Sequence, residues 1–240
     1  MSLESLKSLL SLVGPNHILP PMAESPLVLA LDTGSPIVSV ALGRGGEVLA
    51  ARAIEQARSS ATLLDQVAAV LAEIGARPAD LGAVVALRGP GSFTGLRIGL
   101  STALGLHQAL GVRATALPTL RALATWAAGA AGEAGEGPVL AVVDALRGEW
   151  SAQLFSADPF PRALSAEELR PGTELAGRIA GFGVSRLAAD ARGLLLLEPG
   201  PLAPAAIRLA AEPDLAWDPS LLTSPLYARP PAVTVPKGRA

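Results

Sequence analysis

The chain has no cysteine among its 240 residues and only two histidines, His17 and His107. The absence of cysteine excludes disulfides, a thiolate nucleophile and any Cys-based metal site. Neither histidine has a neighbour at metal-ligand spacing in the sequence. We therefore expect no His- or Cys-based metal site and no catalytic residue of either type.

Aromatic residues are also scarce, at 3%, and no apolar run approaches the ~20 residues of a membrane-spanning helix. Lys and Arg (19) nearly balance Asp and Glu (21). A net charge of -2 argues against a protein that binds nucleic acid alone through a basic surface. Half of the residues are hydrophobic and 17% are charged, which is typical of a compact protein. We expect it in the cytoplasm, without a membrane partner.

Residues 1–26 do not form a convincing signal peptide, because Glu4 offsets Lys7 and the apolar stretch that follows is short. Met22 lies just before the first long apolar run. We expect residues 1–26 to be a disordered extension outside the fold, and both Met1 and Met22 remain open as the native start.

Residues 27–128 contain short apolar runs and amphipathic stretches in the order βββαβαβα. The expected strands cover 27–31, 37–42, 47–54, 83–87 and 112–117, and the expected helices cover 63–74, 95–110 and 118–128. The first three strands form a meander with glycine-containing turns. This order predicts a first domain with a mixed sheet flanked by helices.

The Gly/Ala/Glu-rich stretch 129–138 has no apolar pattern and is interpreted as a linker. The first pattern then partly repeats in a second, smaller domain over 138–230, before a tail at 231–240. Expected strands cover 139–143, 149–155, 162–164, 178–182 and 193–197, with a short helix starting at 165 and a helix at 205–211. The last helix can pack back on the first domain. The predicted fold class is α/β in two similar halves.

An aspartate ends the leading strand of each half. Asp32 follows the first strand of the chain, and Asp144 follows the first strand after the linker. Carboxylates at the carboxyl ends of two matched strands imply a cleft between the halves. Each aspartate alone is also explained as a turn residue, and both interpretations stay open.

A glycine-rich loop from Arg88 to Gly99 joins an apolar strand to an apolar helix. Its glycines permit backbone angles closed to other residues, and its serine and threonine can cap the helix. Its two arginines add charge where a helix N-terminus already favours anions. The alternative is a tight, well-capped turn. The residues concerned are Arg88, Gly89, Pro90, Gly91, Ser92, Phe93, Thr94, Gly95, Arg97 and Gly99.

Four stretches together resemble the TsaB (YeaZ) family: LALDT at 29–33, the glycine-rich loop, DALRGE at 144–149 and PLYAR at 225–229. The resemblance covers about residues 27–230. It implies two ribonuclease-H-like halves of the actin/Hsp70-like ATPase type, each with a mixed sheet that contains a βββ meander. It also implies a role in the biosynthesis of threonylcarbamoyladenosine in tRNA.

By this resemblance the chain is a non-catalytic scaffold that pairs with TsaD in a heterodimer. TsaD transfers threonylcarbamoyl from threonylcarbamoyl-AMP to the adenosine beside the anticodon of tRNAs that read codons beginning with A, and the ATPase TsaE supports turnover. The chain would contact tRNA mainly through TsaD and can form a homodimer in isolation, although its oligomeric state alone is left open. No cofactor is bound tightly, although ATP or ADP at the partner interface is left open.

The alternative function is an autonomous ATPase or small-molecule kinase. Asp32, Thr33 and Asp144 would then mark its nucleotide cleft, which the family resemblance treats as vestigial. Pro36 argues against turnover, because it lacks the N–H group that a phosphate-binding turn should offer. The segment before the first helix carries Ser59 where TsaB proteins commonly have a histidine, and it lacks the histidine pair of TsaD.

Small residues recur at intervals of four along the helix after the loop, at Gly95, Gly99 and Ala103. A partner helix can approach such a stripe closely, and the helix from Thr62 would lie beside it. We expect Gly99→Leu or Ala103→Arg to weaken heterodimer formation and leave the fold intact. The alternative is that the stripe seats the helix on its own sheet.

Overall fold

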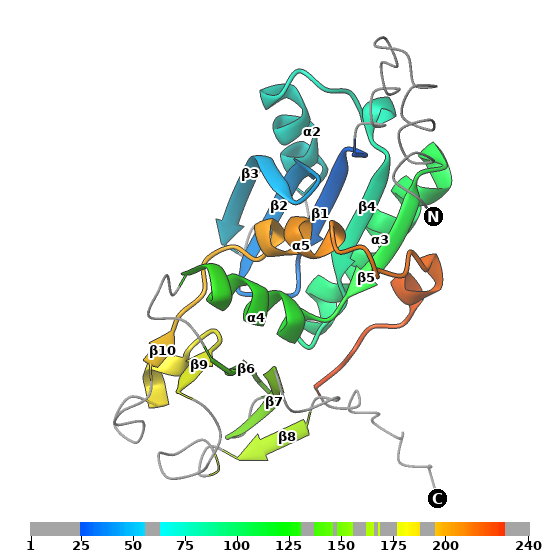
Figure 1. The fold of residues 1–240 in the computed structure, drawn as a ribbon. Helices are drawn as coiled ribbons and strands as arrows, with labels where there is room; N and C mark the ends of the chain where they lie inside the picture. The colour runs from blue at the N-terminus through cyan, green and yellow to red at the C-terminus, as the bar shows by residue number, and fades with distance from the viewer. Residues whose placement is uncertain are drawn as a thin grey trace, which may run out of the picture.

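The computed structural model describes residues 25–55, 63–130, 137–145, 148–155, 162–165, 168, 177–187 and 195–228. These residues form two five-stranded mixed sheets with helices around them (Figure 1). The chain is therefore a mixed α/β protein with two sheets.

The first sheet has the strand order β3-β2-β1-β4-β5. β1, β2 and β3 pair in antiparallel fashion, whereas β4 and β5 add in parallel to β1. All residues of β1 are buried, because it is the central strand of a sheet covered on both faces. The strands are β1 (Val28–Asp32), β2 (Ile37–Arg44), β3 (Glu47–Glu55), β4 (Ala83–Leu87) and β5 (Arg113–Leu117).

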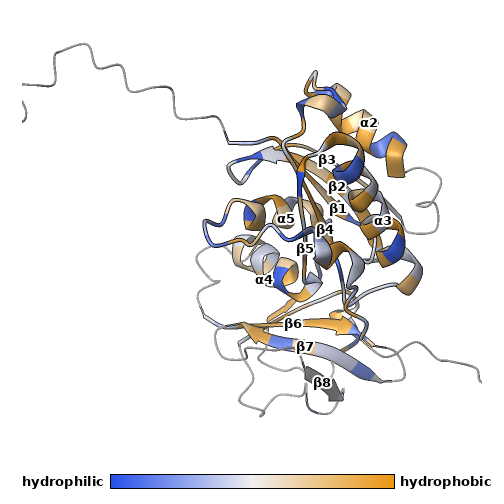
Figure 2. Ribbon diagram, turned by 90° about the vertical axis from the view of Figure 1, so that its right-hand side faces the viewer, coloured by the Kyte–Doolittle hydropathy of each residue, from blue (hydrophilic) through white to orange (hydrophobic). Residues whose placement is uncertain are grey.

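Two helix layers sandwich this sheet. α2 (Leu63–Glu73) and α3 (Phe93–Leu110) cover one face, and α4 (Thr119–Ala130) and α5 (Ala203–Ala210) lie on the other (Figure 2). Side chains alternate along β1, so that Leu29 and Leu31 pack with α2 and α3 while Val28 and Ala30 face α4 and α5.

The second sheet repeats the arrangement of the first, in the order β8-β7-β6-β9-β10. β6 pairs antiparallel with β7 and parallel with β9, as β1 does with β2 and β4. A short 3₁₀ turn, η4 (Val184–Leu187), stands between β9 and β10, where the first half has α3. The strands are β6 (Val139–Asp144), β7 (Glu149–Phe155), β8 (Arg162–Ser165), β9 (Arg178–Ala180) and β10 (Leu195–Leu197).

Helices connect the two halves. α4 contacts β6, β7 and β9 of the second sheet, while α5 follows β10 in sequence and packs on β1 and β2 of the first. Side chains of Ala141 and Val143 on β6, together with Phe182, join the core formed by α4 and α5. The halves thus share an apolar core, which fixes the position of the residues between them.

The predicted strands and long helices are confirmed, with shifts of a few residues at their ends. α3 begins two residues earlier than predicted, at Phe93, because Ser92 is its N-cap and accepts a hydrogen bond from the Gly95 N–H at 3.3 Å. β9 ends at Ala180, two residues early, because the chain turns at Gly181 against the backbone of Val142.

Some predicted features lie outside the described residues: most of the N-terminal extension, the tail at 231–240, Ser59 and Thr62, and most of the helix after 165. Two residues assigned to the extension are described, and the Ser25 carbonyl accepts a hydrogen bond from Arg44 at 3.0 Å. Within the described part of the chain, no helix is long and apolar enough to cross a membrane.

Candidate functional site

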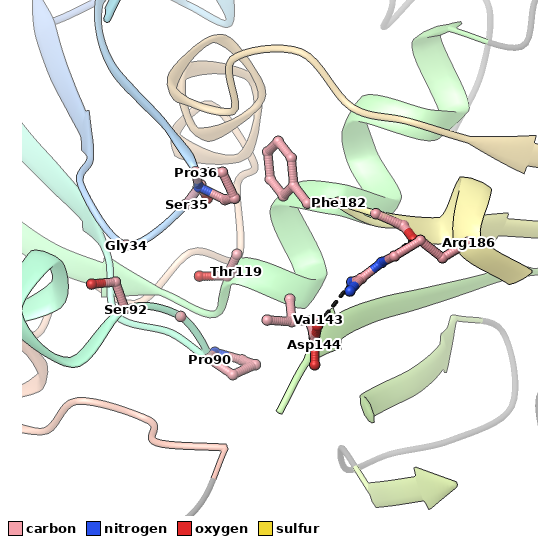
Figure 3. Close-up of a pocket in the computed structure, with 12 residues that line it drawn as sticks. Gly34, Ser35, Pro36, Pro90, Ser92, Thr119, Val143, Asp144, Phe182 and Arg186 are labelled. Atoms are coloured by element: carbon pink, nitrogen blue, oxygen red, sulfur yellow. Dashed lines mark hydrogen bonds and ion pairs between the residues drawn. The ribbon is translucent and has the colours of Figure 1, made fainter. Parts of the chain in front are cut away.

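A cavity of about 410 Å³ lies between the two halves, near the carboxyl ends of β1 and β6 (Figure 3). The first half contributes residues 34–36 and 90–92 with Thr119, and the second half contributes Val143, Asp144, Phe182, Gly183 and Arg186. The glycine-rich loop therefore forms part of the wall.

Asp32 lies beneath this wall rather than in it. Its carboxyl group is fully buried, and Oδ1 accepts hydrogen bonds from the N–H groups of Gly34 at 3.1 Å and Ser35 at 3.2 Å. Burial raises the pKa of Asp32 to about 6, although the hydrogen bonds from Ser35 and Gly34 act in the opposite direction. Oδ2 has no hydrogen-bond partner among the described residues.

This burial predicts a specific dependence of stability on pH. The folded state holds the Asp32 proton up to a pKa of about 6, against 3.8 for a free aspartate. The free energy of unfolding should therefore fall as pH rises through this window, by on the order of 3 kcal/mol.

Asp32→Asn keeps an Oδ1 acceptor and removes the charge. It should therefore abolish the fall in the free energy of unfolding as pH rises. Urea unfolding of both proteins at pH 4, 5, 6 and 7 measures the effect. We expect the asparagine variant to gain stability relative to the parent as pH rises. If the free energy of unfolding changed with pH in the same way in both proteins, the raised pKa of Asp32 would be contradicted.

Asp144 does line the cavity, and it is paired. Its Oδ2 accepts a hydrogen bond from Arg186 at 2.8 Å (Figure 3). Arg186 also donates to the carbonyl of Gly183 at 3.1 Å, and its guanidinium lies 5.5 Å from the ring centre of Trp150. Glu198 accepts the N–H of Gly183 at 2.9 Å, which fixes this turn further.

Of the three residues expected in a nucleotide cleft, only Asp144 reaches the cavity. The expectation that Asp32 and Asp144 together face the cleft is wrong, because Asp32 is sealed beneath the turn that follows β1. Thr33 is also buried, and its hydroxyl donates to the carbonyl of Gly95 at 2.7 Å. Its role is to bind α3 to β1.

Several groups on the wall that could hold a phosphate already have partners within the protein. Phosphate sites use free backbone N–H groups or available cations. Both N–H groups of Gly34 and Ser35 are donated to Asp32, and Pro36 has none. Arg186 is already paired with an aspartate. These groups of the turn after β1 and the side chain of Arg186 are therefore not free to hold a phosphate.

Close backbone contact explains the glycines of the loop. A Cβ at Gly91 would lie 2.6 Å from the carbonyl oxygen of Gly34, and the Ser92 N–H donates to that same oxygen at 2.8 Å. The loop after β4 is thereby joined to the turn after β1. Only residues without a side chain allow this approach.

The C-terminal segment 224–228 forms the other neighbour of the loop. Arg88 donates to the Ser224 carbonyl at 3.2 Å, and the N–H of Leu226 donates to the Arg88 carbonyl at 2.6 Å. Sequence reasoning noted the segment as a family motif without placing it.

The remaining arginine of the loop holds an aromatic pair. Arg97 lies 3.8 Å from the ring centre of Phe93 and donates to the hydroxyl of Tyr227 at 3.2 Å. The rings of Phe93 and Tyr227 are 4.9 Å apart. Both arginines thus contact the C-terminal segment, and anion binding by the loop stays a prediction. Thr94 is exposed, and Ser92 alone caps the helix.

The stripe of small residues faces the interior. Gly95, Gly99 and Ala103 are all buried, and a Cβ at Gly99 would overlap the hydroxyl of Thr33. These three residues are therefore not a partner surface, and the expectation that Gly99→Leu leaves the fold intact is wrong. The alternative explains them: they seat α3 closely on its own sheet. Thr62, expected beside them, lies outside the described residues.

The outer face of α3 is a different set of residues. Phe93 is 39% exposed, and it borders a shallow hollow of about 440 Å³ together with Arg97 and Ser101. On α2, Leu64 is 63% exposed. Exposed apolar side chains thus lie on both helices of this layer.

Two sheets of one strand order, joined by shared helices around a cavity, define a two-half mixed α/β protein. The family model of TsaD, tRNA N6-adenosine threonylcarbamoyltransferase, matches residues 47–156. The tRNA threonylcarbamoyladenosine biosynthesis protein TsaB of Escherichia coli (strain K12) is 39% identical over 124 residues, 51% of this chain and 52% of that protein.

An uncharacterized protein of Mycobacterium bovis is 35% identical over 155 residues, 62% of this chain and 70% of that protein. The structure of YeaZ from Pseudomonas aeruginosa superposes with a TM-score of 0.63 and 28% identity, covering 77% of this chain and 90% of YeaZ. The chain belongs to the TsaB (YeaZ) family. It spans about half the length of the curated TsaB relatives that it matches.

Proposed function

We propose that the chain is a non-catalytic subunit that works with a TsaD-type transferase to make threonylcarbamoyladenosine in tRNA. Membership of the TsaB family carries this proposal, since relatives in Escherichia coli and Bacillus subtilis bear that biosynthetic name. The transferase would move threonylcarbamoyl from threonylcarbamoyl-AMP to the adenosine beside the anticodon of tRNAs that read codons beginning with A.

The arrangement of carboxylates supports a role without catalysis by this chain. Asp32 is fully buried with two amides on one oxygen, and Asp144 pairs with Arg186. General acid–base or metal chemistry needs groups that reach the substrate. Asp32 does not reach the cavity, and Asp144, which does, is paired with Arg186, so the proposal assigns the chemistry to the partner.

The repeated strand order supports the finer interpretation of the fold. Each sheet joins an antiparallel meander to two parallel strands, in matching order. We assign both halves to the ribonuclease-H-like type of the actin/Hsp70-like ATPases. In this assignment η4 replaces the helix that corresponds to α3.

The proposed partner surface is the outer face of α2 and α3, including Leu64, Phe93 and Ser101. The same surface would form a homodimer when the transferase is absent. TsaE and tRNA would join through the transferase, in keeping with the net charge of -2. Any ATP or ADP is proposed for the partner interface.

A reconstituted modification assay tests the function. It contains tRNA, TsaD, TsaE and the threonylcarbamoyl-AMP synthase, with and without this chain. We expect modified adenosine only when the chain is present, and no ATP turnover by the chain alone. An assay indifferent to the chain would overturn the proposal, and ATP turnover by the purified chain would favour the autonomous ATPase.

Charged residues introduced on the proposed partner surface should weaken binding to TsaD and leave the fold of the chain intact. We expect Leu64→Glu and Ser101→Arg each to weaken TsaD binding at least about tenfold, with little change in the melting temperature. Leu49→Glu is the matched control, because Leu49 is 41% exposed on β3, outside the proposed surface. Binding by all three variants at parental affinity would move the interface elsewhere.

A further inference from the structure

A second cavity, of about 460 Å³, lies at the other end of β1 from the cavity between the halves. Val28, the first residue of β1, lines it, whereas residues 34–36 beyond the end of β1 line the first cavity. The start of β5, the turn between β2 and β3 and the segment that follows α5 complete its wall. Its volume is within the range of small-molecule sites.

Arg113, at the start of β5, provides the cation of this cavity. Its side chain is exposed, and its guanidinium lies 4.7 Å from the ring centre of Trp217, which also lines the cavity. Within the described part of the chain, this guanidinium makes no ion pair and no hydrogen bond. A stacked guanidinium keeps the N–H groups at its edge available, and their fork matches the two oxygens of a carboxylate.

Contacts between distant segments hold this stack in place. The backbone N–H of Arg113 donates to the Gly82 carbonyl at 3.2 Å. The hydroxyl of Thr115 donates to the carbonyl of Ala216 at 3.0 Å, next to Trp217, and the indole packs against the core around α4 and α5. Because the guanidinium is ordered before a ligand arrives, binding costs less conformational entropy.

The segment after α5 brings negative charge to the same cavity. Ala210 and Ala211, at the carboxyl end of α5, line it together with Glu212. The carboxyl end of a helix carries partial negative charge and favours a cation. Glu212 is bound to Arg121, which is not among the lining residues and holds the carboxylate at the edge of the cavity. A multiply charged anion would be repelled here, whereas an ammonium group would be stabilised.

We infer that this cavity binds a small zwitterion of the amino-acid class. The carboxylate of the ligand accepts two hydrogen bonds from Arg113, and its ammonium group lies beside Glu212 at the carboxyl end of α5. Its apolar part contacts the proline rings of Pro26 and Pro213, which also line the cavity. This site is independent of the proposed function. Its failure would leave the modification assay unaffected, and the reverse also holds.

Titration of the isotope-labelled full chain with L-leucine, followed by nuclear magnetic resonance, tests the inference. We expect the indole N–H signal of Trp217 to shift with a Kd of about 5 mM or tighter, while the signals of Trp126 and Trp150 stay in place. No shift of Trp217 up to about 20 mM leucine, or a shift of Trp150 instead, would overturn the site.

Two derivatives of the same ligand test which charges are recognised. L-Leucinamide keeps the ammonium group without the carboxylate, and N-acetyl-L-leucine keeps the carboxylate without the ammonium group. Each should bind at least about tenfold more weakly than leucine, because one charged contact is lost. Binding of either derivative as tight as that of leucine would overturn the assignment of a zwitterion.

A substitution at Arg113 locates the carboxylate. Arg113→Met removes the charge and keeps an apolar chain over Trp217, so we expect leucine binding to weaken at least about tenfold with little change in the melting temperature. Arg52→Met is the matched control, because Arg52 is an exposed arginine of β3, paired with Glu73 outside the cavity. Parental affinity in Arg113→Met, or an equal loss in Arg52→Met, would overturn the role of Arg113.

Discussion

Replacement of Gly99 by leucine is expected to lower the free energy of unfolding by about 4 kcal/mol or more. Gly99 lies on the inner face of α3, where even a Cβ would overlap the hydroxyl of Thr33. That hydroxyl donates to the Gly95 carbonyl at 2.7 Å, so a larger side chain would break this link as it pushes α3 away from β1. Urea unfolding followed by circular dichroism measures the loss.

Gly105 provides the matched control on the same helix. It is exposed, and nothing lies within 4 Å of the position its Cβ would take. Gly105→Leu should therefore leave stability unchanged or raise it by up to about 1 kcal/mol, because leucine favours the helix more than glycine does. Equal urea midpoints for Gly99→Leu and the parent would mean that α3 does not sit on Thr33.

Gly89→Ala is the second substitution with a large expected effect. It should lower the free energy of unfolding by about 4 kcal/mol. Gly89 has φ +108°, which an L-residue adopts with strain, and its Cβ would overlap the carbonyl oxygen of Leu226. The C-terminal segment would have to leave the loop, and the hydrogen bond from the Leu226 N–H to the Arg88 carbonyl would be lost. Hydrogen exchange at Leu226 should therefore accelerate, alongside the loss of stability in urea.

Gly137→Ala separates backbone strain from the clash. Gly137 has φ +114°, close to that of Gly89, but nothing lies within 4 Å of its Cβ position. Its substitution by alanine should lower the free energy of unfolding by only about 1–3 kcal/mol, the cost of backbone strain. Hydrogen exchange at Leu226 should stay unchanged. If both alanine variants behaved alike, the contact between the loop and the C-terminal segment would have no energetic importance.

The strands and most helix limits could be predicted because their signals are local. Apolar runs of five residues give β1 and β4, and three- and four-residue spacing gives α2. The Gly75 that ends the pattern of α2 has φ +68°, as a helix terminator requires. Errors at the limits arose where a cap or a turn depended on one side chain, as at Ser92.

The candidate site was less predictable, because its properties depend on contacts between distant segments. Sequence reasoning identified the glycine-rich loop and both aspartates, but placed Asp32 in the cleft and the small residues of α3 on the surface. It could not pair Arg88 with Ser224, which lies 136 residues further along the chain. Nor could it show that Thr119 lines a cavity together with residues of the second half.

The sequence by itself determined the order of strands and helices, the absence of cysteine chemistry and the loop that requires glycine, since these follow from residue type and short spacing. Only the tertiary structure decided which face of α3 is buried, which aspartate reaches the cavity and what the two arginines of the loop bind. Periodicity shows that a helix has two faces. Which of them meets the sheet depends on close contacts such as that between Gly99 and Thr33, made by residues far apart in the chain.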